Sequence, residues 1–209
     1  MIKKLAAGFT GFYGKPANIM TCAALIIFGT SRLAFAICAA AALVWGYVFS
    51  VTLIHSSKRF FPKSVFNNIL SLCVFGFAAG LFQLFMELAC PALAMETALI
   101  VLIVPALCFV GNIERRTERS PLLSAVTSAV LEAAGIGVFL VAFALIREPL
   151  GYGSLSLPGG LKGYYEIFSV DKSGFPVRII SAPAGALLLS GYIFIVFKMI
   201  KPAAKKEEK

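Results

Sequence analysis

The chain has 209 residues, of which 59% are hydrophobic and 14% are charged. A water-soluble domain of this length cannot bury so much apolar surface, so the composition excludes a soluble protein and indicates a membrane protein. The net charge of +9 does not indicate a nucleic-acid surface, because the basic residues are distributed unevenly between the two sides of the predicted spans.

Three apolar segments make up the first half of the chain. The first, residues 17–29, has 13 residues, which is about 20 Å of helix against a hydrocarbon core of about 30 Å. It ends at Gly29-Thr30-Ser31-Arg32, where small and polar residues break the helix and must line protein or a polar cavity. Polar residues precede it and no clear cleavage site follows, so we do not expect a signal peptide. Full-length spans are predicted at 33–54 and 69–90.

The second half has the same order of segments. A short segment at 98–110 contains Pro105, which is expected to kink or interrupt the helix. Full-length spans follow at 125–146 and 179–200. Gly135 and Gly137 in the first of these predict a close approach of a neighbouring helix.

The order short, long, long in both halves predicts two inverted three-helix repeats, roughly 1–90 and 91–209. The expected fold is therefore an all-α membrane protein with six transmembrane helices, of which the first and fourth are broken, in a single integral-membrane domain over 1–209. The longest connection, 147–178, is expected either to form a lid or docking surface or to cover helix ends.

The basic residues predict the orientation of the spans. Fourteen of the 19 Lys and Arg residues fall on the side of the N-terminus, and five fall on the other side. This asymmetry follows the positive-inside rule and predicts that both termini are cytoplasmic. The five on the opposite side are Arg32, Arg147, Lys162, Lys172 and Arg178.

Two of the five cysteines, Cys22 and Cys108, lie in the two short segments and are expected to meet if the helices are straight. A thiolate in hydrocarbon is too costly unless a metal takes its charge. Two thiolates are half of a four-cysteine [2Fe–2S] set, whose other half would come from a second chain or from the remaining cysteines. Inert, apolar cysteines are the alternative. With no Cys-x-x-Cys pair and one histidine, a zinc or haem site made by this chain alone is not expected.

Glu132 lies seven residues inside its predicted span and is the candidate for an ion-pathway or proton-relay group. The alternative is a carboxyl group that is hydrogen-bonded by Ser or Thr of a neighbouring helix.

Several segments resemble the membrane subunits of Rnf/Nqr electron-transport complexes, specifically RnfE and its counterpart NqrD. Residues 144–155, A-L-I-R-E-P-L-G-Y-G-S-L, resemble the R-E-x-x-G-x-G-x-L signature that ends the fifth helix of that family. Residues 182–186, A-P-A-G-A, resemble the P-P-G-A entry to its last helix, and 20–25, M-T-C-A-A-L, resemble its first-helix G-L-C-P-L-L. Gly111 and Glu114 fit the motif N-C-x-x-x-G-R-x-E after the fourth helix.

This resemblance implies a function. Family members form a heterodimer with an oppositely oriented paralogue, RnfA or NqrE, and two cysteines from each chain hold a [2Fe–2S] cluster within the bacterial cytoplasmic membrane. Flavin-bearing and iron–sulfur subunits complete an ion-translocating oxidoreductase. The resemblance therefore implies that Cys22 and Cys108 are cluster ligands and that the chain is not a catalyst by itself.

The chain departs from the family motif around its second cysteine. When Gly111 and Glu114 are aligned, the family's cysteine position falls on Leu107, so Cys108 comes one residue late. Asn112 replaces the family's arginine. One residue turns a helical side chain by about 100°, and an interruption at Pro105 is expected to absorb this shift.

Two other functions remain open from the sequence. One is a small secondary transporter, or a transporter subunit, with the same inverted repeat around a midplane site and no redox centre. The other is a structural membrane scaffold with inert cysteines.

Overall fold

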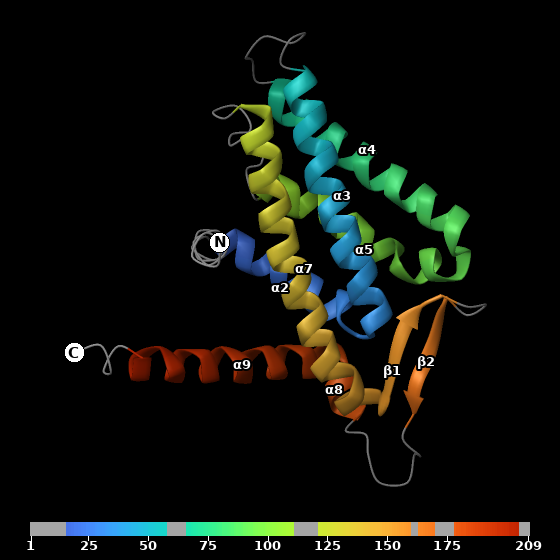
Figure 1. Cartoon of the computed structure of the whole chain (residues 1–209), viewed down its shortest axis with the longest axis vertical. Helices are drawn as coiled ribbons and strands as arrows, with labels where there is room; N and C mark the ends of the chain where they lie inside the picture. Colours follow the sequence, from blue (N-terminus) through green and yellow to red (C-terminus); the bar gives the residue numbers. More distant parts are fainter. Residues whose placement is uncertain (1–15, 58–65, 111–120, 160–162, 170–177, 205–209) are drawn as a thin grey trace.

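The computed structural model is mostly helical (Figure 1). The part of the chain that it describes consists of residues 16–57, 66–110, 121–159, 163–169 and 178–204.

Among these residues, three helices are long and apolar enough to cross a membrane: α3 (Leu33–Ser57), α4 (Phe66–Ala89) and α7 (Leu122–Tyr152). The other long helices are α2 (Pro16–Gly29), α5 (Pro91–Val110) and α9 (Pro183–Ala204). A four-residue helix, α8 (Arg178–Ser181), precedes α9. The prediction of an all-α membrane protein is thus confirmed in its main part, since the chain is mostly helical with apolar helices, although a β-hairpin is also present; six spans and the inverted repeat stay predictions.

Apolar side chains on the outside of the long helices are consistent with a lipid environment. Helix α4 is the clearest case, because Leu72, Phe77, Phe85 and Leu88 are all more than half exposed. Such a helix is apolar on all sides, whereas a surface helix of a soluble protein has one apolar face.

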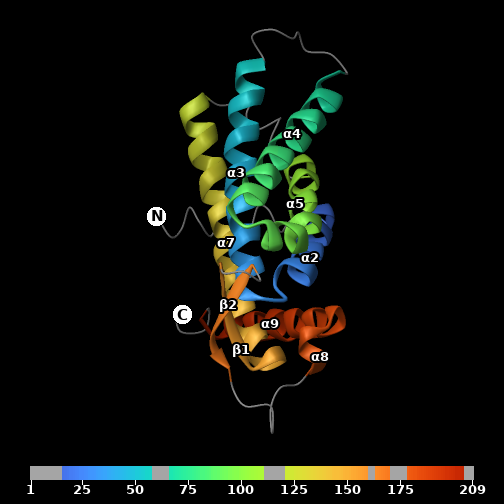
Figure 2. The ribbon, with the colours of Figure 1, turned by 90° about the vertical axis from the view of Figure 1, so that its right-hand side faces the viewer.

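Helices α2, α3, α4, α5 and α7 run in alternating directions along the molecule (Figures 1 and 2). Helices α3 and α7 form the most extensive contact, and a Cβ on Gly137 of α7 would lie 2.9 Å from the Cβ of Ala40 of α3. The close helix approach predicted from this glycine is therefore confirmed. The core between these helices contains Tyr47, Phe75 and Phe143, which are at most 2% exposed.

The structure corrects the expectation for the second short segment. Helix α5 has 20 residues, begins at Pro91 and continues through Pro105. The predicted 13-residue segment at 98–110 is therefore the second part of a longer helix. The preceding residues, from Pro91 to Thr97, are already helical because Ala94 N–H bonds Cys90 O at 3.0 Å. The break after α2, by contrast, lies at Gly29–Arg32 as predicted.

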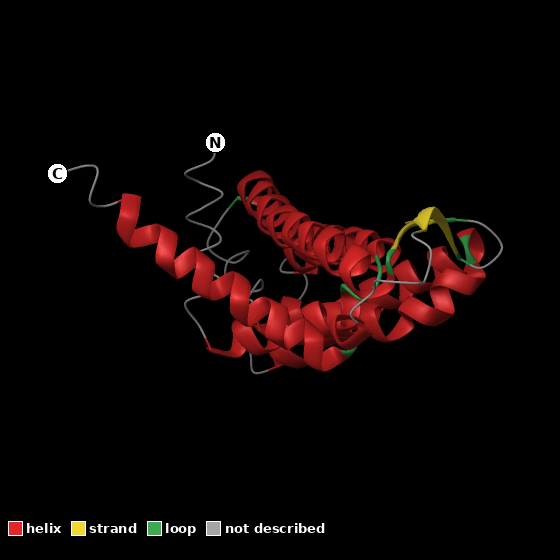
Figure 3. Ribbon diagram, turned by 90° about the horizontal axis from the view of Figure 1, so that it is seen from below, coloured by secondary structure: helices red, strands yellow, loops and turns green. Residues whose placement is uncertain are grey.

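Helix α9 has a different direction from the other long helices. It runs across α3 and α7 and extends away from them toward the C-terminus (Figures 1 and 3). It packs on α8 and α2, near its own start, where Ala186 is fully buried. Farther along, Leu187, Leu188 and Tyr192 are more than half exposed.

The predicted loop 147–178 contains an antiparallel hairpin of β1 (Ser154–Pro158) and β2 (Tyr164–Ser169). Strand β1 packs against α3 and α7. Its Leu155 and Leu157 pack on a small cluster that includes Leu33 and Ala144. Of the roles expected for this connection, the hairpin fulfils that of covering helix ends.

Candidate functional site

The two helices that carry the candidate ligands pack side by side. Helix α2 carries Cys22, whose side chain is outside the described part of the structure, and α5 carries Cys108. A Cβ on Gly29 would lie 3.7 Å from Cγ2 of Ile100, so the end of α2 lies at the middle of α5. The helices run in opposite directions (Figures 1 and 2).

Cys22 and Cys108 therefore lie at nearly the same level. Cys22 is seven residues before Gly29, about 10 Å along α2, and Cys108 is eight residues after Ile100, about 12 Å along α5. The backbone places both cysteines toward the same end of the molecule, as the sequence predicts.

The Cys108 thiol points into the bundle. It is 1% exposed, and its Sγ would lie 3.9 Å from a Cβ on Gly46 of α3. The hydroxyl of Ser50, one turn farther along α3, is next to it. Because α5 is not interrupted at Pro105, the one-residue shift against the family motif remains a rotation of about 100°.

Glu132 of α7 is near the same thiol and within range of electrostatic interaction with it. The structure thus brings two of the three predicted site residues, Cys108 and Glu132, to one place in the core. On the α3 side, Gly46 and Ser50 lie next to the Cys108 thiol. Gly111, Asn112 and Glu114, which carry part of the family resemblance, lie outside the described residues.

Gly46→Ala is expected to displace α5 from α3, because a Cβ there would lie 2.7 Å from Cγ1 of Val104. Overpacking of this kind costs about 1–3 kcal/mol. Thermal unfolding of the purified protein in detergent measures the loss. The double variant Gly46→Ala, Val104→Ala is expected to recover most of it, and failure of this rescue would contradict the predicted contact.

The most extensive polar cluster of the described residues is at the other end of α7. The Arg147 guanidinium is 1% exposed and donates to six acceptors. Nη1 bonds the carbonyl of Ile27 at 3.2 Å, that of Ile26 at 3.4 Å and Oγ1 of Thr30 at 2.9 Å. Nε and Nη2 bond the three carbonyls of residues 180–182 at 2.9–3.1 Å.

Four of these acceptors are among the last carbonyls of α2 and α8, where the helix dipoles place negative charge, and the other two are the Thr30 hydroxyl and the Ala182 carbonyl, just beyond the helix ends. The positive guanidinium therefore closes two helix ends at once. Thr30 adds to this arrangement, because its hydroxyl also donates to the carbonyl of Ile26.

Glu148, whose charge is opposite to that of Arg147, caps a third helix end, the N-terminus of α3. Its side chain is fully buried, and Oε2 accepts the backbone N–H of Leu33, the first residue of α3, at 2.7 Å. A carboxylate at a helix N-terminus is stabilised by the dipole. Its other oxygen, Oε1, has no hydrogen-bond partner among the described residues. We refer to Arg147, Glu148 and Thr30 with their bonded backbone groups as the helix-end cluster.

Arg32, in the break between α2 and α3, contacts the hairpin at this end of the bundle. Its guanidinium carbon lies 4.0 Å from the ring centre of Tyr164 and 5.0 Å from that of Tyr152. It also forms an ion pair with Glu166 at 3.6 Å. The break between α2 and α3 is thereby covered by β2.

The sequence did not predict the helix-end cluster. Arg147 and Glu148 were recognised only as part of a motif and were assigned to a loop, whereas the structure continues α7 through Pro149 to Tyr152. The available signal was a charged pair next to small residues, Gly151 and Gly153. A Cβ on Gly151 would lie 3.0 Å from the nitrogen of Ser181, so only glycine allows α8 to come this close.

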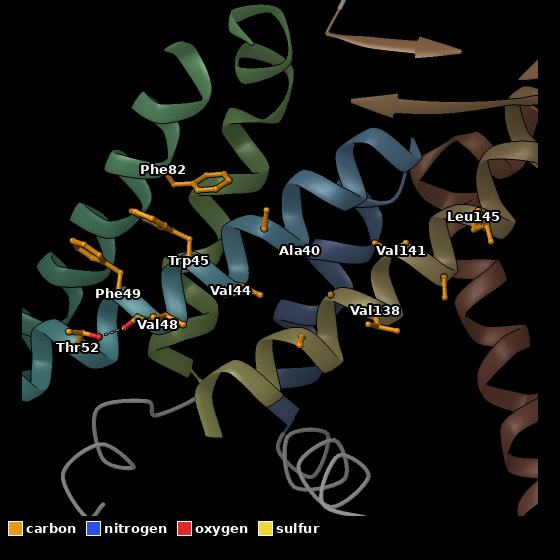
Figure 4. Close-up of a pocket in the computed structure, with 14 residues that line it drawn as sticks. Ala40, Val44, Trp45, Val48, Phe49, Thr52, Phe82, Val138, Val141 and Leu145 are labelled. Carbon is orange, nitrogen blue, oxygen red and sulfur yellow. Dashed lines mark hydrogen bonds between the residues drawn. The ribbon is translucent and has the colours of Figure 1, made fainter. Parts of the chain in front are cut away.

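A groove of about 1040 Å³ lies between α3 and α7, with Phe82 of α4 at one end (Figure 4). Its lining is apolar, with Val44, Val138 and Leu145 among the side chains. Its polar groups are already bonded, since Trp45 Nε1 donates to Ala78 O and Thr52 Oγ1 donates to Val48 O. The groove can hold apolar matter such as lipid chains, but it has no free polar group to orient a polar substrate.

Within the described residues, no group of three or more His, Cys, Asp and Glu could hold a metal ion. The predicted [2Fe–2S] set does not require one, because it takes only two ligands from this chain. Cys108 fits such a half-set in residue type and in its level along the bundle, but its thiol faces α3, so it would have to turn toward α2 to share a cluster with Cys22. No family model matches the chain, and no curated protein matches it either.

Proposed function

We propose that this chain is an integral-membrane subunit of an ion-translocating electron-transport complex of the Rnf/Nqr type. In this proposal Cys22 and Cys108 supply two ligands of a [2Fe–2S] cluster, and an RnfA/NqrE-like paralogue supplies the other two. When bound, the cluster carries one electron at a time across the membrane.

The observation that carries the proposal is the packing of α2 against α5 with both cysteines at one level. Two ligands on adjacent helices can approach a cluster from one side and leave the other side for a partner. Cys108 is almost completely buried, and burial favours a thiolate only if a metal shares its charge.

A second point supports the proposal. The two segments with the strongest family resemblance, 144–155 and 182–186, meet in the helix-end cluster, where Arg147 bonds the carbonyl of Ala182 at 3.1 Å. The resembling residues are therefore those that join helix ends, rather than scattered positions of similar composition.

The proposed topology has six spans in a bacterial cytoplasmic membrane, with both termini in the cytoplasm. It requires α9 to turn at Ala182-Pro183 and align with the other spans. Since Leu187, Leu188 and Tyr192 of α9 are exposed, the partner subunit would supply the surface against which these side chains pack. The flavin-bearing and iron–sulfur subunits would bind at the membrane surfaces.

A cysteine series tests the proposal. The chain is co-purified with its paralogue without oxygen, and the visible and electron paramagnetic resonance (EPR) spectra of the cluster are recorded. Cys22→Ala and Cys108→Ala are each expected to abolish the signal, and Cys73→Ala, an exposed cysteine on α4, is expected to leave it unchanged. A cluster signal that survives loss of both Cys22 and Cys108 would rule out this chain as a source of ligands.

The second candidate is a small secondary transporter without a redox centre, and it is favoured by Glu148. A fully buried carboxylate oxygen with no hydrogen-bond partner among the described residues, next to a helix break, can bind a cation. This function predicts a heterodimer or monomer without iron whose thermal stability rises with Na⁺ concentration, and a loss of that rise in Glu148→Gln.

A further inference from the structure

Helix α2 is short and is joined to α3 through a break, so its own hydrogen bonds do not fix its position. A helix of 14 residues depends on tertiary contacts for its stability and its placement. Among the described residues, Arg147 makes the largest set of polar contacts to α2 and its break. The contacts that fix the C-terminal end of α2 therefore also determine the position of the middle of this helix.

Cys22 is one helical turn before Ile26, about 6 Å away along the axis. The Arg147 Nη1 group bonds the carbonyls of Ile26 and Ile27 and the hydroxyl of Thr30. The same guanidinium is held from the other side by the carbonyls of residues 180–182, and it extends from α7, which packs closely on α3. The last turn of α2 is thus tied to the rigid part of the bundle through one side chain.

Arginine suits this role better than lysine. The guanidinium has five N–H donors in a rigid plane and stays charged when buried, and six acceptors surround it here. An ammonium group has three donors, so Arg147→Lys leaves carbonyls of α2 or of residues 180–182 without a donor.

We infer that Arg147 is a positioning residue for Cys22: by bonding the carbonyls of Ile26 and Ile27 and the hydroxyl of Thr30, it fixes the last turn of α2 and thereby the position of the Cys22 backbone relative to α5. This inference rests on the proposed function, which makes Cys22 a cluster ligand. The position of α2 itself can be measured with or without a cluster.

The first test measures α2 in the apoprotein. The hydrogen–deuterium exchange rates of the backbone amides of Cys22 and Cys108, both helical, are followed by mass spectrometry of the full chain in detergent. Loss of one hydrogen bond to a charged group raises the population of an opened state about tenfold, so Thr30→Val is expected to raise the Cys22 rate about tenfold. Arg147→Lys is expected to raise it further.

Two controls separate positioning from general destabilisation. Thr52→Val makes the same substitution in α3, where the hydroxyl bonds only the carbonyl of Val48 in its own helix, and it is expected to leave the Cys22 rate unchanged. The Cys108 rate is expected to stay the same in Thr30→Val, because no hydrogen bond of Arg147 within the described residues goes to α5.

The second test uses the anaerobic heterodimer. At unchanged iron content, Thr30→Val and Arg147→Lys are expected to shift the midpoint potential and the EPR g-values of the cluster, whereas Thr52→Val gives the wild-type values. A merely structural role would lower the yield without changing the spectrum of the protein that remains.

The outcomes distinguish the two claims. Wild-type Cys22 rates in Thr30→Val and Arg147→Lys would overturn the inference, whatever the cluster does. A heterodimer without iron that still shows the tenfold rise would overturn the proposed function and leave the positioning of α2 in place. If Arg147→Lys does not fold, Thr30→Val decides.

Discussion

Gly185→Ala is expected to prevent stable folding of the C-terminal part of the bundle. A Cβ at this position would overlap the carbonyl oxygen of Ile179 and would lie 2.5 Å from Cα of Ile180. Both atoms belong to the backbone of α8, so no side chain can move aside to make room. The carbonyl of Ile180, which Arg147 bonds, would have to shift as well.

The expected loss is about 3 kcal/mol or more, at the upper end of overpacking effects, because backbone rather than a flexible side chain is displaced. The matched control is Gly191→Ala, two turns farther along α9, where a Cβ would meet nothing within 4 Å. Size-exclusion profiles and thermal unfolding in detergent measure both. Equal stability of the two variants would contradict the described packing of α8 on α9.

Arg147→Met is expected to cost about 3–5 kcal/mol, because it removes a buried guanidinium that bonds several oxygens, and each buried acceptor left without a donor costs about 1–3 kcal/mol. Methionine has a similar length but no donors, so six carbonyl and hydroxyl oxygens lose a donor in a region closed to water.

Arg32→Met is the control for this prediction, since it removes a guanidinium from the same end of the bundle. Arg32 is partly exposed, with an ion pair at 3.6 Å and stacking on Tyr164. Contacts of this kind contribute about 1 kcal/mol. If thermal unfolding shows the two variants to be equally stable, then Arg147 does not join the helix ends as described.

The membrane class and most helix positions were predictable because they follow from apolar length. A run of apolar residues has to be helical in a bilayer, since each backbone N–H and C=O must be bonded within its own segment. The break at Gly29–Arg32 was predictable for the same reason, because four small or polar residues interrupt the apolar run.

Pro105 shows where a local rule is overridden. Proline removes one backbone hydrogen bond, but the surrounding residues of α5, Val101 and Val104 among them, are buried against other helices and hold the helix together. The opposite case is residues 147–152, where two charges and a proline indicated a loop. There the charges are used by helix ends that are distant in sequence, which no local pattern reveals.

For the candidate site, the sequence predicted the residue types and the level of the two cysteines along the bundle. It did not predict the direction in which the Cys108 side chain points. That Cys22 and Cys108 fall at one end of the molecule follows from segment lengths. That Cys108 points toward Gly46 and Ser50, with Glu132 nearby, depends on the rotation of α5, which is set by its packing against α3. A rotation of one residue changes no hydropathy pattern in a helix that is apolar on all sides.

The most direct test of the central claim is the iron and acid-labile sulfide content of the heterodimer that this chain forms with its paralogue, purified without oxygen and separated from the soluble subunits. The account predicts about two iron and two sulfide ions per heterodimer, as in a single [2Fe–2S] cluster. An intact, folded heterodimer that contains neither iron nor sulfide would contradict it.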